Sequence, residues 1–176
     1  MRHLVEKVGE RRVAAVYSSR MRPAVESAEL AASELGLAAV VVDGLQELSA
    51  GGLAAVSLKD RRAPHVLDAL LRAGPDIGRP AAQDAHLVVK GFAQAVGEIA
   101  DMHRGETVLV FTHGAAMSLA VRTLLANVGD DLGGQRFPAS CALAEVEVDA
   151  DGWRLTAWPA VADQMMLAGE APAASP

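Results

Sequence analysis

The segment from residue 107 to residue 129 constrains the fold more than any other part of the chain. It begins with the apolar and β-branched run TVLVFT, continues with His113 and Gly114, and ends with AAMSLAVRTLLANVG. A short, continuously apolar run is typical of a strand buried on both faces, and a longer run rich in alanine and leucine is typical of a helix. This segment therefore predicts a buried strand, a sharp turn and a helix.

A strand–helix–strand unit is predicted near the N-terminus. Val13–Tyr17 (VAAVY) and Ala39–Val42 (AVVV) are short apolar runs, and between them stands PAVESAELAASELG. Pro23 suits the first turn of a helix, and Gly36 suits the residue that follows the last turn. Two strands joined by a helix in this way are expected to be parallel.

The remaining elements complete an α/β pattern. Helices are expected within Leu58–Ala73 and after Asp84, which can cap a helix, and a hairpin is expected from Ala142–Val148 and Trp153–Trp158. Strands that alternate with helices predict an α/β sandwich with a mostly parallel sheet. We expect one domain over residues 1–167 and a flexible tail over residues 168–176.

Charge and composition exclude several classes of partner. The chain carries 16 Lys and Arg against 22 Asp and Glu, and no basic cluster has aromatic residues interleaved, which disfavours nucleic-acid binding. No apolar run approaches the roughly 20 residues that span a bilayer, and the charged start MRHLVEKVGERR lacks a signal-peptide core, so we expect no membrane association and a cytoplasmic location. The single cysteine, Cys141, has no partner for a disulfide or thiolate metal site, and we expect it to be a small core residue.

Two turns carry the candidate binding residues. Ligands of parallel sheets bind beyond the carboxyl ends of the strands, where the sequence places the Ser18–Arg22 turn and the His113–Gly114 turn. His113 would stand near the positive end of the following helix, and Gly114 would let an anion approach the backbone. Ser19 offers a hydroxyl, and Arg20 and Arg22 offer guanidiniums that bind phosphate or carboxylate. A small anionic or phosphorylated ligand is therefore the expected partner.

Four segments together resemble one family. YSSRMRPAVESAEL, GLQELSAGGL, ETVLVFTHGAAMSLAVRTLL and CALAEVEVDADGWRL are similar, in order and spacing, to segments of the histidine phosphatase (phosphoglycerate mutase-like) superfamily. The resemblance implies a three-layer α/β/α sandwich. It also implies phosphoryl transfer without a metal or other cofactor, in which a histidine of an Arg-His-Gly motif attacks phosphorus and a carboxylate protonates the leaving oxygen.

The sequence departs from this family at the residues that carry the chemistry. Arg-His-Gly does not occur in the chain, and LVEKVGERR looks like the end of the family's first helix, so the first strand is expected to be missing. The alignment places Pro23 where the phosphate-binding arginine belongs, with Arg22 one position earlier. Gln83 stands where the general acid is expected, and an amide cannot transfer a proton. His113 is the catalytic candidate that remains, and Glu47 is expected to organise a loop.

Two functional hypotheses follow from these departures. The first is a degenerate histidine phosphatase-like protein, without ordinary phosphomonoesterase activity, whose pocket binds a small molecule or supports a recruited reaction. The alternative is an active phosphatase or mutase-type enzyme whose nucleophilic histidine is encoded upstream of Met1. A missing inner strand would leave backbone groups of the neighbouring strands unpaired. Either the sheet closes up, or another segment or subunit covers the gap. Because a second subunit could cover it, we expect a homo-oligomer.

Overall fold

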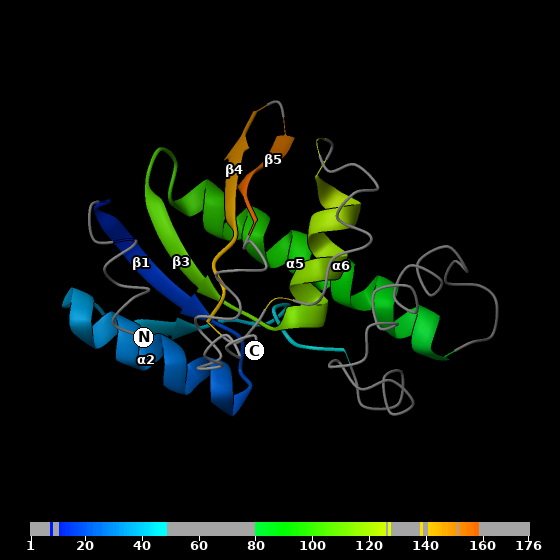
Figure 1. The fold of residues 1–176 in the computed structure, drawn as a ribbon, viewed down its shortest axis with the longest axis horizontal. Coiled ribbons are helices and arrows are strands. Elements are labelled where there is room, and N and C mark those ends of the chain that lie inside the picture. The colour runs from blue at the N-terminus through cyan, green and yellow to red at the C-terminus, as the bar shows by residue number, and fades with distance from the viewer. Residues whose placement is uncertain are drawn as a thin grey trace, which may run out of the picture.

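A computed structural model describes residues 8, 11–48, 80–125, 127, 138, 141–150 and 152–158, with the backbone alone for residues 80–83. Three strands, β1 (Val13–Ser18), β2 (Ala39–Val41) and β3 (Thr107–Phe111), form a parallel sheet in the order β2-β1-β3 (Figure 1). The expected parallel pairing of the first two strands is confirmed. The predicted helix within Leu58–Ala73 and the tail over residues 168–176 lie outside the described residues.

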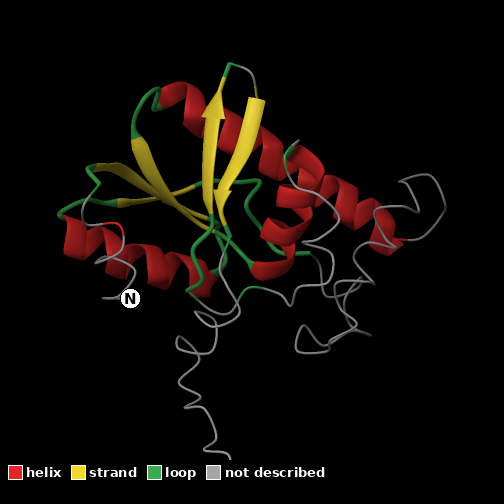
Figure 2. Cartoon of the chain, turned by 45° about the horizontal axis from the view of Figure 1, so that its top comes forward, coloured by secondary structure: helices red, strands yellow, loops and turns green. Residues whose placement is uncertain are grey.

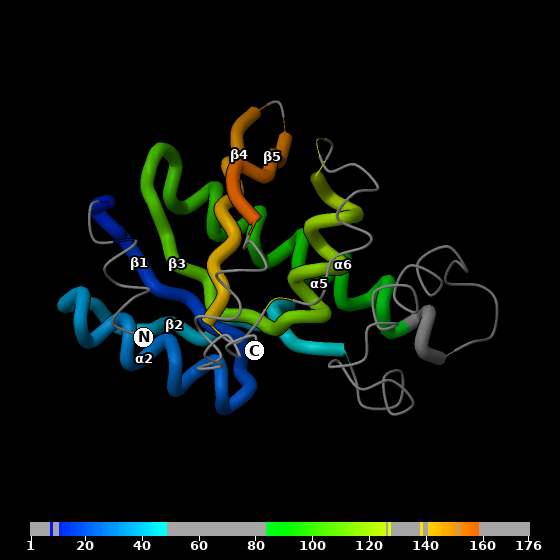
Figure 3. The backbone as a smooth tube through the Cα atoms, in the orientation of Figure 1, coloured from blue at the N-terminus to red at the C-terminus, as the bar shows by residue number. Residues whose placement is uncertain are grey.

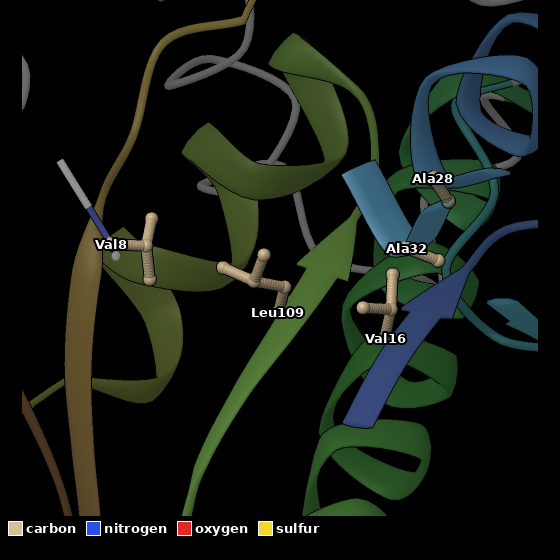
Figure 4. Close-up of a cluster of buried hydrophobic side chains, with 5 residues drawn as sticks. All are labelled: Val8, Val16, Ala28, Ala32 and Leu109. Carbon is tan, nitrogen blue, oxygen red and sulfur yellow. The ribbon is translucent and has the colours of Figure 1, made fainter. Parts of the chain in front are cut away.

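Helix α2 (Arg22–Leu35) covers one face of this sheet. It begins with Pro23 in its first turn and ends at Gly36, whose left-handed backbone, with φ 68°, lets its N–H reach the carbonyls of the last turn. Its buried residues are the alanines Ala24, Ala28, Ala31 and Ala32, which let the helix approach the strands closely. Figure 4 shows Ala28 and Ala32 facing Val16 of β1, with Leu109 of β3 and Val8 in the same cluster.

Helices α5 (Pro80–Met102) and α6 (Gly114–Leu124) pack against each other. Their shared core consists of Leu48, Ala85, Val89, Ala115 and Leu119. As Figure 2 shows, the strands lie between α2 and the long helix α5, so helices cover both faces of the sheet, in agreement with the expected three layers. The expectation that Asp84 caps a helix is wrong, because α5 already begins at Pro80 and Asp84 lies inside it.

The predicted hairpin is confirmed as β4 (Glu145–Asp149) and β5 (Gly152–Ala157), an antiparallel pair. It forms a second sheet, and among the described strands β3 is hydrogen-bonded to β1 alone. One edge of β3 therefore has no described partner strand. The expected homo-oligomer stays a prediction.

Cys141, expected in the core, is exposed, because it lies in the turn before the hairpin with a positive φ of 61°.

No helix in the described ranges is long and apolar enough to span a membrane. Within the same ranges no group of three histidine, cysteine or acidic side chains could hold a metal ion.

Candidate ligand-binding site at the carboxyl ends of the strands

The turns that follow β1, β2 and β3 meet at one edge of the sheet, as the path of the tube in Figure 3 shows. Strand β1 leads through Ser19 and Arg20 to α2, and β3 leads through Thr112 and His113 to α6. The segment after β2 contacts both turns, because Thr112 donates a hydrogen bond of 2.9 Å to the Leu45 carbonyl and Arg20 forms an ion pair with Asp43. Parallel strand pairing thus brings three distant segments together at the place expected for a ligand.

Ser19 and His113 are in direct contact. Ser19 Oγ lies 2.7 Å from Nε2 of His113, and the Met21 N–H donates to the same oxygen at 3.3 Å. The serine is completely buried. Burial lowers the pKa of His113 below its ordinary value of 6.5, more than the nearby Glu47 charge raises it. A neutral ring with its proton on Nδ1 can accept the Ser19 O–H at Nε2, which satisfies the hydroxyl on both sides.

Glu47 occupies the N-terminus of α6. Its Oε2 accepts the Ala115 N–H at 3.1 Å, and its Oε1 accepts the N–H groups of Ala116 at 2.8 Å and of Leu48 at 3.0 Å. The N–H groups of Ala115 and Ala116 are donors that a helix start leaves without partners, and a negative charge there is favourable. We expected a free helix end beside His113 and a loop-organising Glu47. The carboxylate occupies that helix end, and its contacts with Leu48 and α6 agree with a loop-organising role.

The two candidate arginines have different partners. Arg20 forms an ion pair with Asp43, and both side chains are well exposed. Arg22 is bonded to Glu26 at 2.6 Å, one turn along α2, and 89% of its side chain is exposed. Exposed ion pairs contribute only about 0–1 kcal/mol, so a ligand can compete for either guanidinium. Arg20 follows β1 directly and shares the strand-end turn with Ser19, whereas Arg22 is already helical. A binding role for either stays a prediction.

Gly114 is the first residue of α6, and a side-chain carbon there would make ordinary van der Waals contact with the Pro138 carbonyl oxygen, at 3.7 Å. The approach of an anion to the backbone at Gly114 stays a prediction. The side chain of Gln83 lies outside the described residues, so its predicted role is untested.

A second described histidine, His103, is held away from this edge. Its Nδ1 lies 2.8 Å from Glu106 Oε2, and its Nε2 lies 2.8 Å from the Tyr17 hydroxyl. His103 follows α5 and precedes β3, so it stands near the amino end of that strand. Within the described ranges, no second imidazole is hydrogen-bonded to the Ser19–His113 pair.

The comparisons with known proteins agree with this architecture. The profile described as Histidine phosphatase superfamily (branch 1) matches residues 1–160. The chain belongs to the histidine phosphatase superfamily. No curated protein matches the sequence.

Solved structures similar to this chain agree with the fold. YhfR of Bacillus stearothermophilus is similar with a TM-score of 0.63 and 21% identity, over 87% of this chain and 77% of that one. A mycobacterial glucosyl-3-phosphoglycerate phosphatase, solved with VO3, is similar with a TM-score of 0.64 and 18% identity, over 90% of this chain and 82% of that one. At these identities the similarity establishes the fold of this histidine phosphatase superfamily member.

The electrostatics of the Ser19–His113 pair can be measured by NMR titration of the histidine ring. We expect the pKa of His113 to lie below 6.5, because the ring is desolvated. We expect Glu47→Gln to lower this pKa further, because it removes the charge that favours the imidazolium. A His113 pKa that rises in the variant would contradict the electrostatic effect assigned to Glu47.

Proposed function

We propose that this chain binds a small anionic or phosphorylated molecule at the edge formed by Ser19, Arg20, His113 and Gly114, without phosphomonoesterase turnover. The observation that carries the proposal is the hydrogen bond between Ser19 and His113. It joins the two strand-end turns, and the Arg20 guanidinium beside Ser19 in the chain is exposed. This guanidinium is a charged donor of the kind that recognises oxyanions.

We expect no phosphomonoester turnover because neither histidine at a described strand end has a free nucleophilic nitrogen facing a ligand. Transfer to an imidazole needs a nitrogen that is free to attack phosphorus, and Nε2 of His113 is bonded to the buried Ser19. The other described ring at a strand end, His103, is engaged by Tyr17 and Glu106. The VO3 complex of the mycobacterial phosphatase supports oxyanion binding in this fold.

Binding can be tested by calorimetric titration with inorganic phosphate and by thermal unfolding in its presence. A ligand that binds only the folded chain raises the unfolding midpoint. We expect Arg20→Ala to weaken phosphate binding about fivefold, since it removes a charged donor. Arg104→Ala is the matched control, because Arg104 is also exposed and paired with an aspartate but lies near the amino end of β3. Equal loss in both variants, or no binding in the wild type, would contradict the proposal.

A second candidate function is an active phosphatase or mutase-type enzyme that acts on a phosphorylated metabolite, with its nucleophilic histidine encoded upstream of Met1. The observation that favours it is the edge of β3 that has no partner among the described strands, beside a hairpin that forms a separate sheet. An additional strand would satisfy such an edge. Reading the genomic sequence before the start codon tests this candidate, which requires an in-frame Arg-His-Gly.

A further inference from the structure

Asp43 holds the guanidinium on which the proposed site depends. Its carboxylate forms an ion pair with Arg20, the residue that follows the buried Ser19 in the turn after β1. The side-chain amide of Gln46 donates a second hydrogen bond to the same carboxylate oxygen, at 3.3 Å. The carboxylate therefore has two partners, and one of them is the charged donor that an anionic ligand would use.

Two contacts anchor the loop that carries Asp43. A side-chain carbon at Gly44, the next residue, would lie closer than 3.0 Å to the Gly91 carbonyl oxygen of α5, so these two backbones are in contact. The Thr112 hydroxyl holds the Leu45 carbonyl at 2.9 Å. The Asp43 side chain itself is 69% exposed, so it can turn away from the guanidinium while the loop stays in place.

We infer that Asp43 is a built-in competitor, which occupies the Arg20 guanidinium until an anionic ligand displaces it. The inference rests on the proposed function. Guanidinium N–H groups bind carboxylate and phosphate oxygens in the same way, so the ligand and Asp43 compete for the same donors. The apparent affinity for a ligand is reduced by the fraction of molecules in which the guanidinium is already occupied. Because exposed ion pairs are weak, the reduction is moderate and a ligand can overcome it.

Calorimetric titration with inorganic phosphate tests the inference on Asp43→Asn, which keeps the shape of the side chain and removes its charge. We expect this variant to bind phosphate about threefold more tightly than the wild type, because the ion pair no longer has to be broken. Asp101→Asn is the matched control, since Asp101 is also exposed and paired with an arginine, Arg104, away from the site. The control should leave the affinity unchanged.

A double variant separates displacement from a general effect of charge. If Asp43 acts by occupying Arg20, its replacement gains nothing once the guanidinium is absent, so Arg20→Ala with Asp43→Asn should bind phosphate as Arg20→Ala does. An equal gain with and without Arg20 overturns the inference, because it reports only the loss of a nearby negative charge.

The outcomes also distinguish the inference from the proposed function. If Asp43→Asn binds phosphate no more tightly than a wild type that does bind it, the inference is overturned and the proposed function stands. If neither the wild type nor Asp43→Asn binds phosphate, the proposed function is overturned and the inference with it.

Discussion

Replacing Gly44 with alanine is expected to lower the free energy of unfolding by about 3 kcal/mol, from backbone strain and overpacking together. Gly44 has a φ of 91°, and a side-chain carbon there would lie closer than 3.0 Å to the carbonyl oxygen of Gly91 in α5. The loop that carries Leu45 and Glu47 into the site is thus anchored by contact between two glycines. Thermal unfolding should show a midpoint lower by about 6–12 °C for a chain of this size.

Gly36→Ala is the matched control for this prediction. Gly36 also has a left-handed backbone, with φ 68°, but nothing lies within 4 Å of the position of its missing side chain. Its replacement should therefore cost only the backbone strain, about 1 kcal/mol. Equal midpoints for the two variants would show that the approach of Gly44 to α5 does not hold the loop.

Replacing Glu47 with alanine is expected to destabilise the protein by about 2 kcal/mol, because three backbone N–H groups lose their acceptor. Equilibrium unfolding in urea measures the change. Asp43→Ala serves as the control, since Asp43 lies in the same loop but 69% of its side chain is exposed in an ion pair with Arg20. We expect that control to change stability by less than about 0.5 kcal/mol. A Glu47→Ala variant as stable as the control would contradict the capping role.

Local patterns in the sequence were sufficient for the elements that position the site. The run before His113 and the run before Ser19 read as buried strands, and parallel pairing places their ends at one edge. The meeting of Ser19 and His113, 94 positions apart, follows from that pairing. Gly36 was recognised as a helix end because its conformational freedom is a property of the residue itself.

The contacts that the sequence did not predict depend on tertiary packing. Glu47 reaches α6 across 68 positions, and nothing in GLQELSAGGL indicates which helix start its carboxylate binds. Whether Arg20 and Arg22 face a ligand or a neighbouring acid depends on the placement of Asp43 and Glu26. The sequence predicts the start of α5 after Asp84, because aspartate is a common N-cap residue. In the structure α5 begins four residues earlier, at Pro80.

We propose that this site holds an anion and does not accept a phosphoryl group, and an assay of 4-nitrophenyl phosphate turnover by the purified chain tests this proposal. We expect no release of nitrophenolate above the buffer rate, with or without His113→Ala, because Nε2 of His113 is engaged by Ser19. Turnover that His113→Ala abolishes would contradict the claim.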